Sequence, residues 1–109
     1  MGMHFSLLFE HDKYAITERH RETIREIARV FNQNDVPEVE ITGHADASGT
    51  EPYNRSLSRD RAYAVSQAMI EAGIDPSFLE LDWKGEEDLY VETPDGVKER
   101  ANRRVEITF

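Results

Sequence analysis

Alternating and periodic hydrophobic positions divide the chain into short strands and amphipathic helices. The stretch His4–Phe9 is short and largely apolar, which predicts a strand that ends at the charged residues 10–13. Thr17 can cap a helix that ends near residues 32–35, before Pro37. Apolar residues at the spacing i, i+3, i+4 and i+7 give this helix one buried face, formed by Ile24, Ile27, Ala28 and Phe31.

A second strand followed by a second helix is predicted in the middle of the chain. Residues 38–42 alternate between acidic and apolar side chains, which predicts a half-buried strand that ends at Gly43. A polar loop is expected from His44 to Pro52. A second amphipathic helix then ends at Gly73, and its buried positions are Leu57, Ala64, Val65, Ala68, Met69 and Ala72.

The last third of the chain predicts two more strands. Phe78–Lys84 is expected to be a third strand, followed by an acidic loop over residues 85–96. A short helical turn is expected around residues 97–101. Arg104–Phe109 alternates in the manner of a final strand. The predicted element order is βαβαβ(α)β.

This order predicts an α/β (α+β) fold. Right-handed crossovers through helices of this length place both helices on one face of a mixed sheet, as a two-layer sandwich. Residues 1–109 suffice for a single domain with one core. The opening Met1-Gly2 is typical of a cloning remnant, so an export signal or membrane anchor is expected outside this segment.

Composition narrows the classes of partner. The formal net charge of −9 argues against binding to nucleic acid or to anionic lipid. The apolar runs are too short for a membrane span, so no membrane insertion by this chain is expected. The sequence contains no cysteine, which excludes disulfides and thiolate metal sites but leaves the redox compartment open.

Arg61 is the most informative single residue. It lies one helical turn from both Leu57 and Val65, on the apolar face of the second predicted helix. A buried, unpaired guanidinium costs several kcal/mol, so Arg61 requires a carboxylate partner, a pocket open to solvent, or both. Asp46, a few residues after the second predicted strand, is the natural counterpart.

Two interpretations of Asp46 and Arg61 remain open from spacing alone. In the first, they form an ion pair that fastens the helix to the loop. In the second, they bind a zwitterion: Asp46 takes an ammonium group and Arg61 takes a carboxylate through a two-pronged hydrogen bond. An amino acid with both groups free would fit such a site.

Metal and hydrolase sites are the weaker alternatives. His44 and Asp46 form an H-x-D pair, and His4, His11 and His20 are further potential ligands. The spacings typical of zinc enzymes and the G-x-S-x-G elbow are both missing from the sequence. We therefore expect no cofactor, no metal and no catalysis.

Other residues leave both a binding and a packing role open. Four aromatic side chains could stack on a sugar ring or fill the core and its rim: Tyr53, Tyr63, Trp83 and Tyr90. The cluster of Arg100, Arg103 and Arg104 could be a solvated patch, or one of its members could bind a carboxylate.

Three motifs carry a resemblance to a known family. The run TGHADASGTEPYNRSLSRDRAYAV, residues 42–65, closely resembles the signature of OmpA-like domains, a family that includes peptidoglycan-associated lipoproteins and flagellar stator proteins. The tail NRRVEI, residues 102–107, resembles its closing signature, and FEHDKYAIT, residues 9–17, continues the likeness. The chain departs from the family pattern after the third strand, where Leu89 stands in place of a usual proline.

The resemblance implies a periplasmic domain that binds peptidoglycan without catalysis and anchors an outer-membrane or other envelope protein to the cell wall. The ligand would be the diaminopimelate residue of the stem peptide, which carries a free amine and a free carboxylate. The resemblance assigns the ammonium to Asp46 and the carboxylate to Arg61. It implies further pocket members at Asp12, Ser48, Asn54, Leu57 and Arg103. The alternative is a module of the same fold with a degenerate pocket that binds other envelope proteins.

Overall fold

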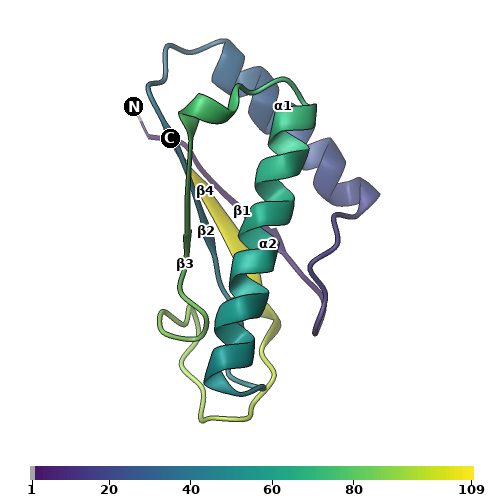
Figure 1. Ribbon diagram of the computed structural model, residues 1–109, viewed down its shortest axis with the longest axis vertical. Helices are drawn as coiled ribbons and strands as arrows, with labels where there is room; N and C mark the ends of the chain where they lie inside the picture. Colours follow the sequence, from purple (N-terminus) through teal and green to yellow (C-terminus); the bar gives the residue numbers. More distant parts are fainter. Residues whose placement is uncertain (1) are drawn as a thin grey trace.

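The computed structural model describes residues 2–109, which form a four-stranded sheet and two long helices (Figure 1). The main elements are β1 (His4–Leu8), α1 (Glu18–Asn32), β2 (Val39–Gly43), α2 (Glu51–Glu71), β3 (Leu79–Trp83) and β4 (Arg104–Thr108). Two short 3-10 turns precede β3 and β4, namely η1 (Pro76–Phe78) and η2 (Arg100–Asn102). The predicted order of elements is confirmed.

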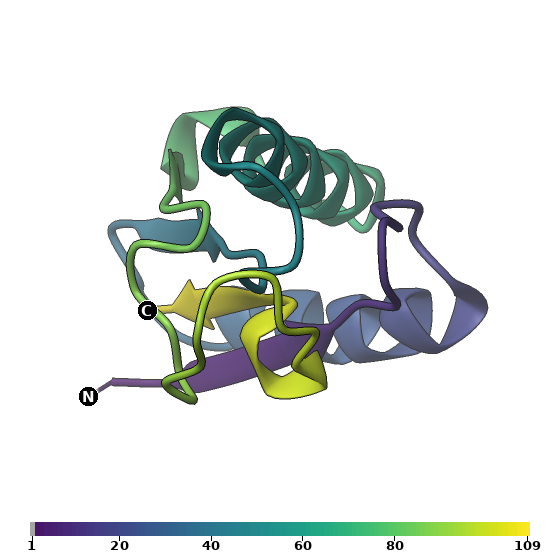
Figure 2. The same ribbon diagram turned by 90° about the horizontal axis from the view of Figure 1, so that it is seen from below.

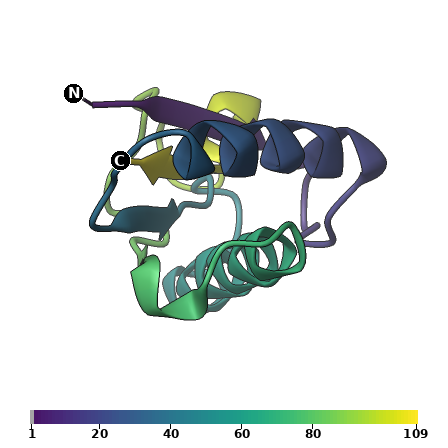
Figure 3. The ribbon, with the colours of Figure 1, turned by 90° about the horizontal axis from the view of Figure 1, so that it is seen from above.

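The sheet is mixed, with the strand order β1-β4-β2-β3. β2 and β3 are parallel, whereas β4 runs antiparallel to both of its neighbours, β1 and β2. The views along the strands show α1 and α2 on the same side of the sheet (Figures 2 and 3). The expected two-layer α+β sandwich is therefore confirmed.

One hydrophobic core fills the space between the sheet and the helices. The strands contribute their inward-facing residues, among them Leu7, Val39, Ile41, Val105 and Ile107. The helices contribute the periodic positions of their buried faces, among them Ile24, Ile27, Phe31, Val65 and Met69. Neither α1 nor α2 is long and apolar enough to cross a lipid bilayer.

Within residues 2–109, neither α1 nor α2 covers the opposite face of the sheet, which is largely polar. Because side chains alternate along a strand, the residues between the core positions point to this open face. They are His4, Ser6, Leu8, Glu40, Thr42, Glu80, Asp82, Arg104, Glu106 and Thr108. The loop between β3 and β4 reaches across from β3 toward β1 on this side (Figure 2).

Gly43 allows α2 to pack closely against the end of β2. A Cβ atom at this position would lie 2.0 Å from the main-chain oxygen of Ser58 and 3.2 Å from the Cβ of Ala62. Only a residue without a side chain permits this approach. Gly43 thereby positions the start of α2 over the segment that follows β2.

The second helix begins earlier than the sequence pattern predicts. The structure starts α2 at Glu51, with Thr50 as its N-cap, so the expected polar loop from His44 to Pro52 is shorter than predicted. The Thr50 side chain accepts a hydrogen bond from the Tyr53 main-chain nitrogen, and proline is well tolerated in the first turn. The first turns lack apolar periodicity because they line a polar site rather than the core.

Two smaller boundaries also differ from the prediction. Phe78 belongs to η1 and not to the third strand, because Asp75 caps a 3-10 turn there. The helical turn expected at residues 97–101 is the 3-10 turn Arg100–Asn102, capped by Glu99. The cap at Thr17 is confirmed, since its side chain accepts a hydrogen bond from the His20 main-chain nitrogen.

Candidate functional site

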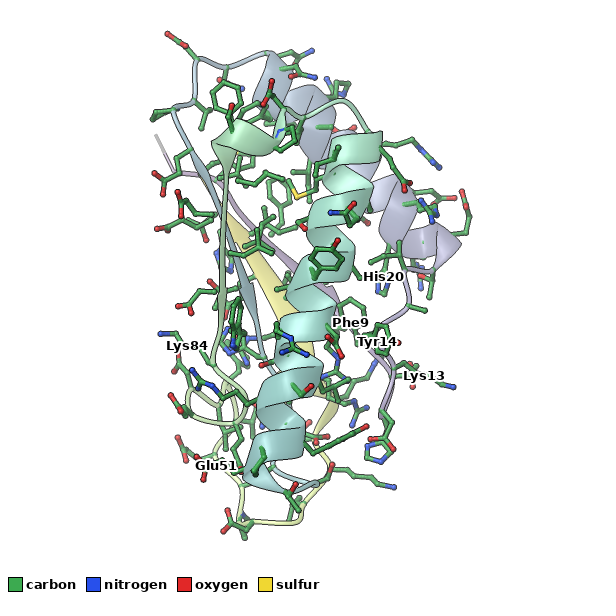
Figure 4. All side chains as sticks on the ribbon, in the orientation of Figure 1. Phe9, Lys13, Tyr14, His20, Glu51 and Lys84 are labelled. Atoms are coloured by element: carbon green, nitrogen blue, oxygen red, sulfur yellow. The ribbon has the colours of Figure 1, made fainter. Side chains whose placement is uncertain are left out.

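Polar groups from four separate segments meet beside the carboxyl end of β2. The segment that follows β2 supplies Asp46, and the middle of α2 supplies Arg61. The segment after β1 and the residues around η2 close over them through hydrogen bonds. The side-chain view shows Phe9 and Lys13 on the segment that runs beside α2 (Figure 4).

Asp46 is almost completely buried, with 3% of its surface exposed. Its Oδ1 atom accepts hydrogen bonds from the Ser48 main-chain nitrogen (3.2 Å) and from the Ser48 hydroxyl (2.6 Å). Its Oδ2 atom accepts from the Glu99 main-chain nitrogen at 3.1 Å. Burial acts to raise the pKa of Asp46, but the hydrogen bonds to its carboxylate outweigh burial and hold the pKa below its ordinary value. Asp46 is therefore a carboxylate at neutral pH.

Arg103 is the cation paired with Asp46. Its Nη1 atom lies 3.0 Å from the Asp46 Oδ2 atom, and its Nε atom donates to the Phe9 main-chain oxygen at 2.9 Å. Both side chains are buried, so the pair is shielded from solvent screening. Arg103 thus ties the segments after β1 and β2 to the start of β4.

Arg61 is fully buried and is held by main-chain carbonyl groups. Its Nε atom donates to the Lys13 oxygen (2.8 Å), its Nη1 atom to the His44 oxygen (3.0 Å) and its Nη2 atom to the Glu10 oxygen (3.2 Å). Burial lowers the pKa of Arg61 to about 10, and the nearby charge of Asp46 opposes this shift. The guanidinium is therefore still charged at neutral pH.

The structure places Asp46 and Arg61 at one site but does not pair them with each other. Among residues 2–109, Asp46 forms its ion pair with Arg103, and the hydrogen bonds of Arg61 go to carbonyl oxygens. The requirement that a buried guanidinium be compensated is met by main-chain dipoles, which leave its positive charge formally unbalanced. The three hydrogen bonds nevertheless hold the guanidinium of Arg61 in one orientation.

Asp12 lies at the edge of the site. Its Oδ1 atom accepts a hydrogen bond from the Tyr53 hydroxyl at 3.1 Å, and its Oδ2 atom lies 3.3 Å from the His11 Nε2 atom. Its side chain is about half exposed, at 53%. Asp12 has a φ angle of 57°, a left-handed conformation that is uncommon for a residue with a side chain.

The remaining predicted site residues fall into two groups. Ser48 donates two hydrogen bonds to the Asp46 carboxylate, as described above. Asn54 and Leu57 are buried on the first turns of α2, where the Asn54 Nδ2 atom donates to the Gly49 main-chain oxygen at 3.1 Å. Asn54 therefore shapes the loop that carries Asp46.

His44 connects the site to the open face of the sheet. Its main-chain oxygen accepts the hydrogen bond from Arg61, while its buried ring lies 3.2 Å from a Glu106 carboxylate oxygen through Nε2. Burial, assisted by the charge of Arg104, lowers the pKa of His44 to about 4. The ring is therefore neutral at pH 7.

A metal site is not formed by these side chains. In the part of the chain that the structure describes, no three histidine or acidic side chains converge on a point that could hold a metal ion. His44 lies beside Glu106, whereas Asp46 is paired with Arg103.

Several groups that build the site were missed by sequence reasoning. They are main-chain atoms, namely the oxygens of Glu10, Lys13 and His44 and the nitrogen of Glu99. Because every residue carries a main-chain carbonyl, no sequence signal could have identified these ones. Tyr53, whose hydroxyl donates to Asp12, was singled out in the sequence only as one of four aromatic residues with a binding or packing role.

The fold and the site define a class of protein: a two-layer α+β sandwich with a buried carboxylate and a buried guanidinium at one end of a mixed sheet. The sequence model of the OmpA family matches residues 8–103. The chain therefore belongs to the OmpA family.

Individual relatives agree with this assignment. The chain is 31% identical over 106 residues to the outer-membrane lipoprotein YfiB of Pseudomonas aeruginosa, covering 97% of this chain and 63% of that protein. It is 38% identical over 69 residues to the peptidoglycan-associated lipoprotein of the same organism, covering 63% and 41%, respectively. The structure of the peptidoglycan-associated lipoprotein from Burkholderia pseudomallei superimposes with a TM-score of 0.84 at 25% identity, covering 94% of this chain and 86% of that one. The chain spans only part of the length of its curated relatives, 29% to 51% for the first three.

Proposed function

We propose that this domain binds peptidoglycan non-covalently, through the diaminopimelate residue of the stem peptide, and performs no catalysis. The observation that carries the proposal is the pair of buried, oriented groups of opposite charge, Asp46 and Arg61, in a member of the OmpA family. Relatives of this chain include an outer-membrane lipoprotein and a peptidoglycan-associated lipoprotein. Their names support a role in the cell envelope, where the domain would hold a parent protein to the wall.

The two groups suit the two ends of a free amino acid. The Asp46 carboxylate, ionised at neutral pH, would accept hydrogen bonds from the ammonium group. Arg61 would donate to the carboxylate of the same residue, and its fixed orientation reduces the entropy lost on binding. A lysine side chain carries the amine without the carboxylate, so it would satisfy Asp46 alone.

Ligand entry requires a small rearrangement, because Arg61 has no exposed surface and Asp46 is only 3% exposed. Residues 10–13 cover Arg61, and Arg103 occupies one oxygen of Asp46. The left-handed conformation of Asp12 costs on the order of 1 kcal/mol, which lowers the cost of moving this segment. The ammonium group would share Asp46 with Arg103 or displace it.

Calorimetric titration with a diaminopimelate-containing stem peptide tests the proposal, with a lysine-containing peptide as the ligand control. We expect saturable binding of the first peptide only. The variants Asp46→Asn and Arg61→Lys should each weaken binding by roughly tenfold to a hundredfold, the loss typical of a hydrogen bond to a charged group.

Matched control variants are available on the same helix. Arg59 and Asp60 immediately precede Arg61 in the chain, and their side chains are 54% and 39% exposed. Arg59→Ala and Asp60→Ala should bind as tightly as the original chain. Circular dichroism establishes that each variant is folded. Retained binding in a folded Asp46→Asn variant would refute the site.

A further inference from the structure

We propose a second, separate binding site: the groove on the open face of the sheet, between β1, β4 and Tyr90, accepts an uncharged sugar ring. The groove has a volume of about 410 Å³ and is lined by His4, Ser6, Leu8, Tyr90, Ala101, Arg104 and Glu106. This volume lies within the range of roughly 300–1,000 Å³ found for small-molecule sites. The groove shares no lining residue with the site of Asp46 and Arg61.

Tyr90 offers an exposed aromatic ring on a segment whose main chain is anchored. Tyr90 belongs to the loop between β3 and β4, and the residue is 75% exposed. The next residue, Val91, exchanges two hydrogen bonds with the side chain of the fully buried Asn102, each of 2.8 Å. One side of the Tyr90 ring faces the guanidinium of Arg104, whose Cζ atom lies 5.6 Å from the ring centre. An exposed ring on an anchored segment offers its free side to the apolar face of a sugar.

Arg104 provides an unused hydrogen-bond donor in the wall of the groove. Its side chain is 6% exposed. Its Nε atom donates to Glu106, and its Nη2 atom lies beside Glu106 and donates to the Asp88 main-chain oxygen. Its Nη1 atom is buried and has no hydrogen-bond partner in the structure. Unsatisfied buried donors are rare, because each costs about 1–3 kcal/mol. An acceptor supplied by a ligand would satisfy this donor after a small movement of Tyr90.

The charges in the groove favour a neutral ligand. The carboxylate of Glu106 lies 2.8 Å from the guanidinium of Arg104, so these two opposite charges compensate each other. An added anion would meet the carboxylate of Glu106, and an added cation would meet Arg104. A hydroxyl group can accept from Arg104 and donate to Glu106 at the same time, which is the recognition that a sugar ring provides.

The geometry favours a sugar over a peptide strand. A peptide bound by strand addition requires unpaired main-chain groups at the edge of a sheet. The groove lies instead on the face of β1 and β4, whose residues pair with each other from His4–Thr108 to Leu8–Arg104. Leu8 and Ala101 add apolar side chains to the lining of the groove, against which the apolar face of a sugar can pack.

Titration of the whole chain with a short β-1,4-linked N-acetylglucosamine oligosaccharide, followed by NMR, tests this proposal. We expect saturable shift changes in residues 4–8, 90–91 and 101–106. Tyr90→Ala should weaken binding about fivefold, as expected for loss of one ring contact, and Tyr90→Phe should retain it. Tyr63→Ala, which removes another exposed tyrosine ring from α2, is the matched control and should have no effect.

Clear outcomes would overturn the proposal. They are no saturable shift at millimolar oligosaccharide, equal binding by Tyr90→Ala and the original chain, or identical shifts produced by a neutral peptide. The test is independent of the stem-peptide site, because Asp46→Asn should bind the oligosaccharide normally. Loss of one activity with retention of the other therefore shows which proposal has failed.

Discussion

Protonation of His44 should destabilise the fold between pH 6.5 and pH 4. The folded state holds the ring neutral, with a pKa of about 4, because the side chain is only 2% exposed and lies near the charge of Arg104. In the unfolded chain the ring has its ordinary pKa of 6.5. The unfolded state therefore binds more protons in this interval, and the free energy of unfolding falls as the pH falls.

The size of this effect follows from the two pKa values. A histidine that titrates at 6.5 when unfolded and at about 4 when folded lowers stability by about 2 kcal/mol at pH 5. At pH 4 the loss reaches about 3 kcal/mol. The stabilising contribution is complete above pH 6.5. Asp46, whose pKa is lowered below its ordinary value of 3.8, contributes its own loss only at more acidic pH.

Urea unfolding at a series of pH values measures this effect. The variant His44→Gln keeps a donor for Glu106 but does not titrate, so it serves as the reference. The difference in unfolding free energy between the original chain and the variant should fall by about 3 kcal/mol from pH 7 to pH 4. Titration of the carboxylates that do not contact residue 44 is common to both proteins and cancels. A constant difference over this range, or an NMR pKa of His44 near 6.5, would refute the reasoning.

Three further predictions concern the framework of the site. Gly43→Ala places a Cβ atom 2.0 Å from the Ser58 main-chain oxygen. Denaturant unfolding should therefore show a loss of stability of about 3 kcal/mol or more, and a loss below about 1 kcal/mol would contradict this packing. Arg103→Met leaves the buried Asp46 carboxylate without its cation, so the free energy of unfolding should fall by about 3 kcal/mol. The pKa of Asp46, followed by NMR, should also rise, and an unchanged pKa would count against the ion pair. Asn102→Ala removes both hydrogen bonds to the loop after β3, so a protease should cut that loop faster than in the original chain. The control Arg59→Ala should be cut at the original rate, and equal rates for the two variants would exclude the anchoring role of Asn102.

Local patterns in the sequence determined the secondary structure and the fold class. The alternation of residues 38–42 and the helical spacing around Ile24 and Ile27 each depend on neighbouring residues alone, and the structure confirms both elements. The early start of α2 was missed, because its first turns carry polar residues that face the site instead of the core. Periodicity detects burial against a core, so it cannot detect helical turns that serve another purpose.

The sequence also determined that Arg61 needs an unusual environment, since a guanidinium stood on an apolar helix face. Only the tertiary structure decided what compensates it. The carbonyls of Glu10, Lys13 and His44 converge on Arg61 from two segments distant in sequence, and Arg103 reaches Asp46 from the far end of the chain. The sequence specifies the chemistry of each side chain. The direction of a main-chain carbonyl, and which distant segments come together, are fixed only when the sheet and helices pack.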